Sequence, residues 1–149
     1  MTTLFEPAAR QAMLDRLAKL SPDSPRQWGK MTAAQMLAHC SRAMEVGTGE
    51  LPLKQSLVGK IFAPFARKTF LSEKPFSRNS PTDPHFVVRD DKDFVKEKAH
   101  LTALIGRFCQ AGPGEAAKHP HSFLGRITGE DWGLVMHKHL DHHLRQFGV

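Results

Sequence analysis

The chain has 149 residues and a formal net charge of +6, with 40% hydrophobic and 24% charged residues. This composition disfavours disordered and fibrous proteins, and the length suits one domain with a hydrophobic core rather than two. We therefore expect a single domain over residues 1–149. No apolar stretch is long enough to span a bilayer and the first residues lack a secretion signal, so we expect a cytoplasmic protein.

The positive charge is concentrated in one segment. Between Lys54 and Arg78 there are six basic residues and one acidic residue, a net of +5 that leaves +1 for all other residues. Because the location of charge matters more than its total for nucleic-acid binding, we expect no nucleic-acid partner. The segment is either a lid that attracts an acidic substrate or a solvated covering. Its basic and aromatic residues alternate as at membrane surfaces, but Pro64 and the short runs argue against a membrane partner.

The first half of the chain predicts two helices. Apolar residues recur with a helical period over 6–20, before a turn-rich stretch of serines and prolines. Thr32 and Gln35 then form a capping-box signature for a second helix, which we expect to end near Val46 at Gly47.

A long connection follows, and two more helices complete the chain. Over 53–71 we expect one or two short helices, divided by Pro64, and over 74–85 a loop. Asp90 or Asp91 is expected to cap a helix that runs to Gln110 and ends at the Gly-Pro-Gly of 112–114. Thr128 with Asp131 predicts the start of the last helix. Because no strand pattern is present, we predict an all-α fold, a four-helix bundle with one long crossover connection.

Four of the nine histidines lie in the last helix, between residues 137 and 143. His139 and His143 are four residues apart, so on a helix both imidazoles lie on one face and can reach a common ion. That face is the apolar, core-facing one. His137 falls on the polar face, and His142 at the border is a reserve ligand. The alternative is a solvated, histidine-rich helix end.

A third ligand has to come from another helix. His39 lies near the apolar stripe of the second predicted helix, where alone it would pass for a hydrogen-bonded core histidine. Facing helices of a bundle build metal sites from inward side chains, so we expect His39, His139 and His143 to bind a divalent metal ion. Nitrogen ligands favour zinc, while nickel, iron and manganese stay open.

A general base is not evident. Leu140 stands where the zincin motif requires glutamate. Asp141 and Glu45 point outward by helical geometry, whereas Gln35 and Gln146 lie near the ligand stripes. His121, on the loop before the last helix, could swing toward the metal. Finally, the two cysteines, Cys40 and Cys109, are expected to be reduced core thiols.

The motif Met36-Leu37-Ala38-His39-Cys40, followed by His139-x-x-x-His143-x-x-Gln146, resembles the DinB-like (YfiT-like) superfamily of metal-binding four-helix bundles. More closely, residues 28–36 and 139–148 are similar to a bacterial branch of uncharacterised function. Where the superfamily pattern often has a basic residue and a glycine, this chain has Leu144 and Arg145.

The resemblance implies a metal triad of His39, His139 and His143. Characterised relatives include transferases and isomerases that use mycothiol or bacillithiol, and others are named hydrolases without a known substrate. We therefore expect a thiol-S-transferase or hydrolase with a small-molecule substrate or a low-molecular-weight thiol. The alternative is a metal-binding or small-ligand-binding protein without catalysis, and a homodimer stays open for either.

Overall fold

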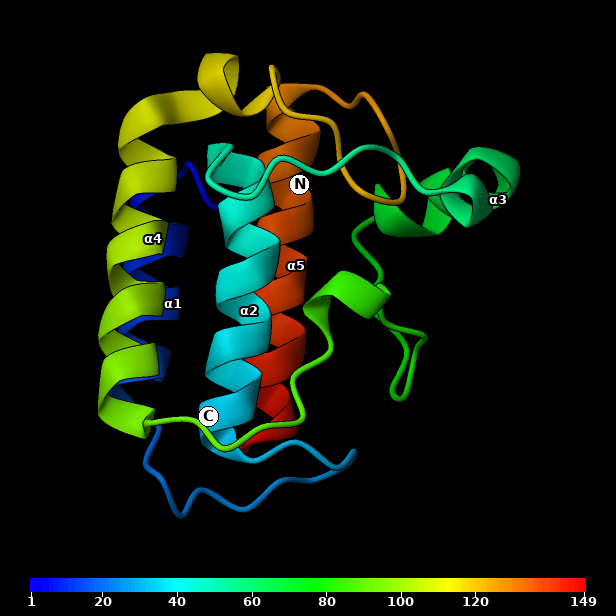
Figure 1. Ribbon diagram of the computed structural model, residues 1–149. Coiled ribbons are helices and arrows are strands. Elements are labelled where there is room, and N and C mark those ends of the chain that lie inside the picture. The colour runs from blue at the N-terminus through cyan, green and yellow to red at the C-terminus, as the bar shows by residue number, and fades with distance from the viewer.

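The computed structural model describes every residue from Met1 to Val149, as five α-helices and one short 3₁₀ turn without strands. The helices are α1 (Pro7–Lys19), α2 (Ala33–Thr48), α3 (Leu57–Phe70), α4 (Phe94–Ala116) and α5 (Gly129–Gln146), and the turn is η1 (Pro84–Phe86). The all-α prediction is confirmed. Helices α1, α2, α4 and α5 lie side by side, whereas α3 stands beside this body (Figure 1). No helix is long and apolar enough to cross a membrane.

The two helices that carry the histidine motifs begin where the sequence predicts. At α2 the Thr32 hydroxyl accepts a hydrogen bond from the Gln35 amide, and the Gln35 side chain accepts one from the Thr32 amide. Thr128 and Asp131 make the same reciprocal pair at α5. Each box satisfies backbone donors that the first helical turn leaves without partners.

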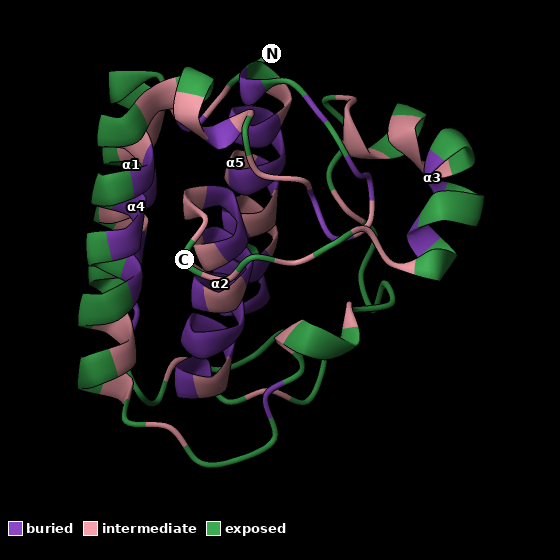
Figure 2. Ribbon diagram, turned by 45° about the horizontal axis from the view of Figure 1, so that its top comes forward, coloured by how far each residue is buried: buried purple, intermediate pink, exposed green.

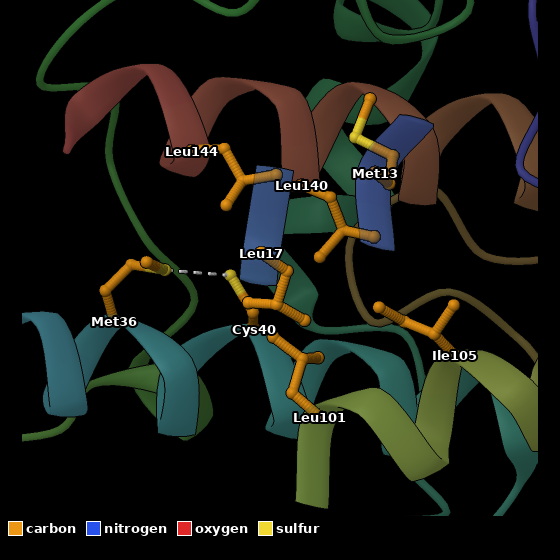
Figure 3. A pocket seen from close by; sticks show the side chains of 8 residues that line it. All are labelled: Met13, Leu17, Met36, Cys40, Leu101, Ile105, Leu140 and Leu144. Atoms are coloured by element: carbon orange, nitrogen blue, oxygen red, sulfur yellow. Dashed lines mark hydrogen bonds between the residues drawn. The ribbon is translucent and has the colours of Figure 1, made fainter. Parts of the chain in front are cut away.

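The core lies between α1, α2, α4 and α5. Most residues of α2 and α5 are buried (Figure 2), because both helices lie between other elements. Two side chains from each of the four helices enclose a small apolar hollow of about 10 Å³ (Figure 3). The hollow is lined by Met13, Leu17, Met36, Cys40, Leu101, Ile105, Leu140 and Leu144. A space of that size and polarity is a packing defect rather than a ligand site.

Both cysteines are free thiols, Cys40 buried and Cys109 half-buried. Burial raises the pKa of each thiol, so neither is an activated nucleophile.

Three helix boundaries differ from their predictions. Helix α2 continues to Thr48 and is capped by Gly49, whose φ of 78° favours glycine. Gly47 instead packs inside the helix, where a Cβ would lie 3.0 Å from the Phe108 ring. The N-cap of α4 is Asp93, which accepts a hydrogen bond from the Lys96 amide, rather than Asp90 or Asp91.

At its other end α4 passes the predicted end at Gln110. Gly112 is non-helical, with φ of 80°, and the chain turns there before a last helical turn to Ala116. The glycine therefore produces a kink rather than the end of the helix.

The prediction that Pro64 divides residues 53–71 is wrong. Helix α3 is continuous over 14 residues with Pro64 inside it. Proline removes the hydrogen bond to the carbonyl four residues earlier, at Lys60, and its ring crowds that carbonyl. Lys60 and Pro64 are both exposed, so water can bond to that carbonyl.

Lys138, on the same side of α5 as Asp141, is buried although it is a lysine. Its ammonium donates hydrogen bonds to the carbonyls of Thr69, Phe70 and Ser72, at 2.9, 2.8 and 2.7 Å. The Phe76 ring lies 4.6 Å from the ammonium. Lys138 thus holds the carboxyl end of α3 against the body, where a cation also complements the helix dipole.

Candidate metal centre

Three histidines from two helices meet inside the protein. His39 comes from α2, and His139 and His143 come from successive turns of α5. One ring nitrogen of each lies within 4.8 Å of the other two. His39 and His143 are 3% and 7% exposed and His139 is half-buried. The structure therefore brings together the three histidines that the sequence singled out.

The second ring nitrogen of His39 has a partner that determines its protonation. Nδ1 lies 3.0 Å from the carbonyl oxygen of Phe86, in η1. A carbonyl only accepts hydrogen bonds, so Nδ1 carries the proton and Nε2 keeps its lone pair. That Nε2 lies 2.9 Å from Nε2 of His139. The lone pair of His39 therefore points into the cluster.

His143 is held in the same tautomer by a side chain. Its Nδ1 lies 2.8 Å from Oε1 of Gln146, and Nε2 of that amide donates to the Trp28 carbonyl at 2.9 Å. The second bond sets the orientation of the amide, so Oε1 faces the histidine and accepts its proton. Nε2 of His143 is thereby left as a free acceptor.

All three imidazoles are neutral at neutral pH. Burial lowers the pKa of His39, lowers that of His139 well below its usual range, and lowers that of His143 to about 3. Repulsion among the rings adds to this effect for His139 and His143. Neutral imidazole is the form that binds a metal ion.

These residues fit a divalent cation. Tetrahedral zinc with bonds of about 2.0–2.1 Å to nitrogen separates its ligand atoms by about 3.3–3.4 Å. This spacing lies between the 2.9 Å contact of His39 with His139 and the 4.8 Å limit of the cluster. Histidine ligands also commonly donate their other N–H to a carbonyl or carboxylate, as His39 and His143 do here. The buried cluster could hold a metal ion, whose identity the geometry leaves open.

The other two histidines of α5 lie outside the cluster. His142 is half-buried, and its ring packs against His143, Trp28 and Phe76 with centroid distances of 5.0, 5.3 and 6.4 Å. His137 is also half-buried and contributes no ring nitrogen to the cluster.

His121 has a structural role in this conformation. Its Nδ1 accepts hydrogen bonds from the amides of Phe123 and Leu124, both at 3.1 Å, and its ring packs 5.2 Å from Trp132. These contacts hold the turn before α5.

The nearby carboxylates are already paired. Glu45 accepts a hydrogen bond from His100 at 2.8 Å. Asp141 pairs with Arg16 of α1 at 2.8 Å and with Arg145 at 3.0 Å. Gln35 caps α2, and its side chain donates to the carbonyls of residues 89 and 90. None of these groups is a free general base.

A polar hollow of about 460 Å³ adjoins the cluster through His142. Its lining consists of Gln27, Trp28, Pro75, Phe76, Arg78, Asp141, His142 and Arg145. The Arg78 guanidinium lies 4.4 Å above the Trp28 ring. Because His142 packs directly on His143, the hollow is separated from the triad by one ring.

The sequence-based reasoning missed the residues that surround the triad. Phe86 and Trp28 act through backbone carbonyls, so their side chains carry no signal of this role. Arg78 and Phe76 were grouped only with a basic loop. The aromatic and basic composition around 70–78 was the available signal.

Fold and site together define an all-α protein with a buried cluster of three histidines. The chain belongs to the family described as "Protein of unknown function (DUF1569)", whose model matches residues 5–148 and so includes all three. Comparisons with curated proteins and with solved structures found no match.

Proposed function

We propose that this chain is a metal-dependent enzyme acting on a small molecule, with one divalent cation held by His39, His139 and His143. The observation that carries the proposal is the pair of hydrogen bonds from His39 to Phe86 and from His143 to Gln146. They leave both Nε2 lone pairs facing the centre of the cluster. A histidine that only packs in the core does not require its lone pair to face those of other histidines.

The arrangement of the helices supports a DinB-like bundle in one domain. The long connection that contains α3 joins α2 to α4, and the histidines come from α2 and α5. This is the distribution of ligands that the resemblance implies. Among the metals, zinc suits three nitrogen ligands best, with nickel, iron and manganese as alternatives.

Three neutral imidazoles would leave a bound divalent cation its full charge and an open position, and there it would lower the pKa of a thiol or water. Glu45 is hydrogen-bonded to His100 and Asp141 is ion-paired with Arg16, so neither carboxylate is free to activate water. A thiol that binds the cation would lose its proton without the help of a separate base. The site therefore favours a thiol-S-transferase over a hydrolase.

The hollow beside the triad supports a small acidic substrate or thiol cofactor. Arg78 and Arg145 supply two cations against the single carboxylate of Asp141. The rings of Trp28 and Phe76 offer apolar walls to the rest of the molecule. A low-molecular-weight thiol that carries a carboxylate matches this combination.

The second candidate is a metal-binding or small-ligand-binding protein without catalysis. The low exposure of His39 and His143 favours it, since a reacting substrate has to reach the ion past His139. Both candidates share the metal site and differ in turnover.

Metal content tests the site. We expect purified protein to bind a divalent metal ion and His39→Ala, His139→Ala and His143→Ala to lose most of it, as measured by elemental analysis and chelator competition. His137→Ala, on the same helix, is the matched control and should retain the metal. Gln146→Ala keeps all three imidazoles but removes the acceptor of His143, so affinity should fall about 10–100-fold. Unchanged metal content in His139→Ala would overturn the triad.

Turnover separates the two candidates. Protein loaded with zinc, nickel or manganese is assayed on thiol conjugates with low-molecular-weight thiols and on ester and amide panels. Thiol transfer that disappears in His139→Ala supports the leading proposal. Tight metal binding without turnover on either panel contradicts catalysis and supports the second candidate.

A further inference from the structure

Helix α3 carries its apolar side chains on the outside of the protein. Leu57, Val58, Ile61, Phe62 and Phe65 are 55–81% exposed. At about 100° per residue these five share one side of the helix, opposite the buried Gly59 and Ala63. Figure 2 shows the helix beside the body with most of its surface exposed. A clustered apolar face of this kind marks an interaction surface.

The orientation of α3 is held at both ends. At its start the Ser56 amide donates to the Ser122 carbonyl at 2.8 Å, and Gln55 donates to the Phe123 carbonyl at 2.9 Å. Gly59 sits so close to that carbonyl that any Cβ would collide with it. At the carboxyl end Lys138 binds three carbonyls. The apolar side is therefore presented outward by the fold.

Positive charge borders this apolar side. Lys54, Lys60 and Lys68 are exposed, and none of them makes an ion pair. They belong to the segment 54–78, which holds +5 of the +6 net charge. An apolar face flanked by unpaired lysines is complementary to a surface of anionic headgroups over hydrocarbon.

The expectation of no membrane partner rested on Pro64 and on the short apolar and basic runs. Because α3 is continuous through Pro64, the first of these premises no longer holds. Fourteen residues make a helix of about 21 Å, enough to lie in the plane of an interface but too short to cross it.

We propose that α3 is a membrane-docking helix, which binds anionic bilayer surfaces by inserting its apolar side while the lysines contact headgroup phosphates. A second copy of the chain is the weaker occupant. A symmetric contact through α3 would bring two segments of +5 together and lose free energy to repulsion. An anionic surface gains from the same charge.

Vesicle binding tests this proposal. The full chain should sediment with vesicles that contain phosphatidylglycerol, bind vesicles of phosphatidylcholine alone much more weakly, and be released by high salt. Phe62→Ser with Phe65→Ser should weaken binding at least about tenfold, because each ring contributes buried apolar area. Both side chains are exposed, so folding should be unaffected, which circular dichroism checks. Val95→Ser, at an exposed apolar residue on α4, is the control.

A charge-matched pair of variants isolates the lysines. Lys60→Glu with Lys68→Glu should lose binding to anionic vesicles, whereas Lys19→Glu with Lys96→Glu has the same net charge and should retain it. Equal loss in both pairs would overturn docking through α3. So would a dimer in sedimentation that Phe65→Ser dissociates, or no binding to anionic vesicles. His139→Ala should bind vesicles normally, so this test fails or succeeds independently of the metal site.

Discussion

At the scale of single residues, the metal centre depends on the partners of the second imidazole nitrogens. Spacing alone predicts that His139 and His143 share a face, but a pair on one face can also be a packed or solvated pair. The Phe86 carbonyl and the Gln146 amide decide the tautomers of His39 and His143. Phe86 lies in a distant segment, and Gln146, although it is only three residues from His143, is oriented by the distant Trp28 carbonyl, so no local pattern reveals either tautomer.

His121 should make stability depend on pH. Its Nδ1 accepts two backbone hydrogen bonds, and burial lowers its pKa to about 4, against about 6.5 in an unfolded chain. Between these values the unfolded state binds more protons, so the free energy of unfolding should fall as pH falls through this window. One unit of pH is worth at most about 1.4 kcal/mol for this group.

Substitution of His121 by asparagine isolates this contribution. Asparagine keeps an acceptor for the two amides but does not titrate. Urea unfolding of both proteins at about pH 7 and about pH 5 should show a smaller loss in His121→Asn, by about 2 kcal/mol at most. Equal losses in the two proteins would show that His121 does not contribute.

At the scale of the helix, the capping boxes were readable from the sequence because each involves residues three positions apart. Two of the differences have non-local causes. Gly47 stays helical because it packs on Phe108, and α3 passes through Pro64 because both ends are held by other segments.

Removing the cap of α5 should destabilise the protein modestly. Thr128→Ala deletes the oxygen that accepts the Asp131 amide and should cost about 1 kcal/mol. For a chain of this size that corresponds to a fall in Tm of about 2–4 °C, measured by thermal unfolding. Thr128→Ser keeps the acceptor and should stay close to the parent. A variant Thr128→Ala with unchanged Tm would contradict the role of the cap.

At the scale of the whole molecule, Lys138 joins α5, which carries the metal centre, to α3. Lys138→Met leaves three carbonyls without their donor and should cost about 2–3 kcal/mol in the free energy of unfolding. Urea unfolding measures this loss, and limited proteolysis should cut the 54–88 segment faster. Lys96→Met, at an exposed residue of α4, serves as the control. Equal proteolysis of variant and parent would show that Lys138 does not hold α3.

The features that could be inferred without the structure are those that depend on nearby residues in the chain. Apolar periods define α1, α2, α4 and α5, hydroxyl and acidic side chains define the caps, and a four-residue interval places His139 beside His143. In each case the interacting groups lie within about one helical turn, so the residue order is sufficient. The choice of His39 needed one further assumption, that two amphipathic helices face each other.

Other features depend on segments far apart in the sequence. His39 and His139, one hundred residues apart, come into contact, Phe86 and Trp28 lend carbonyls to the imidazole network, and Lys138 is buried under α3. The outward apolar side of α3 follows from the same packing, because Gly59 is the residue that fits against Phe123. Burial and second hydrogen-bond partners arise only when the chain closes on itself, and they turn a histidine pattern into a candidate metal centre.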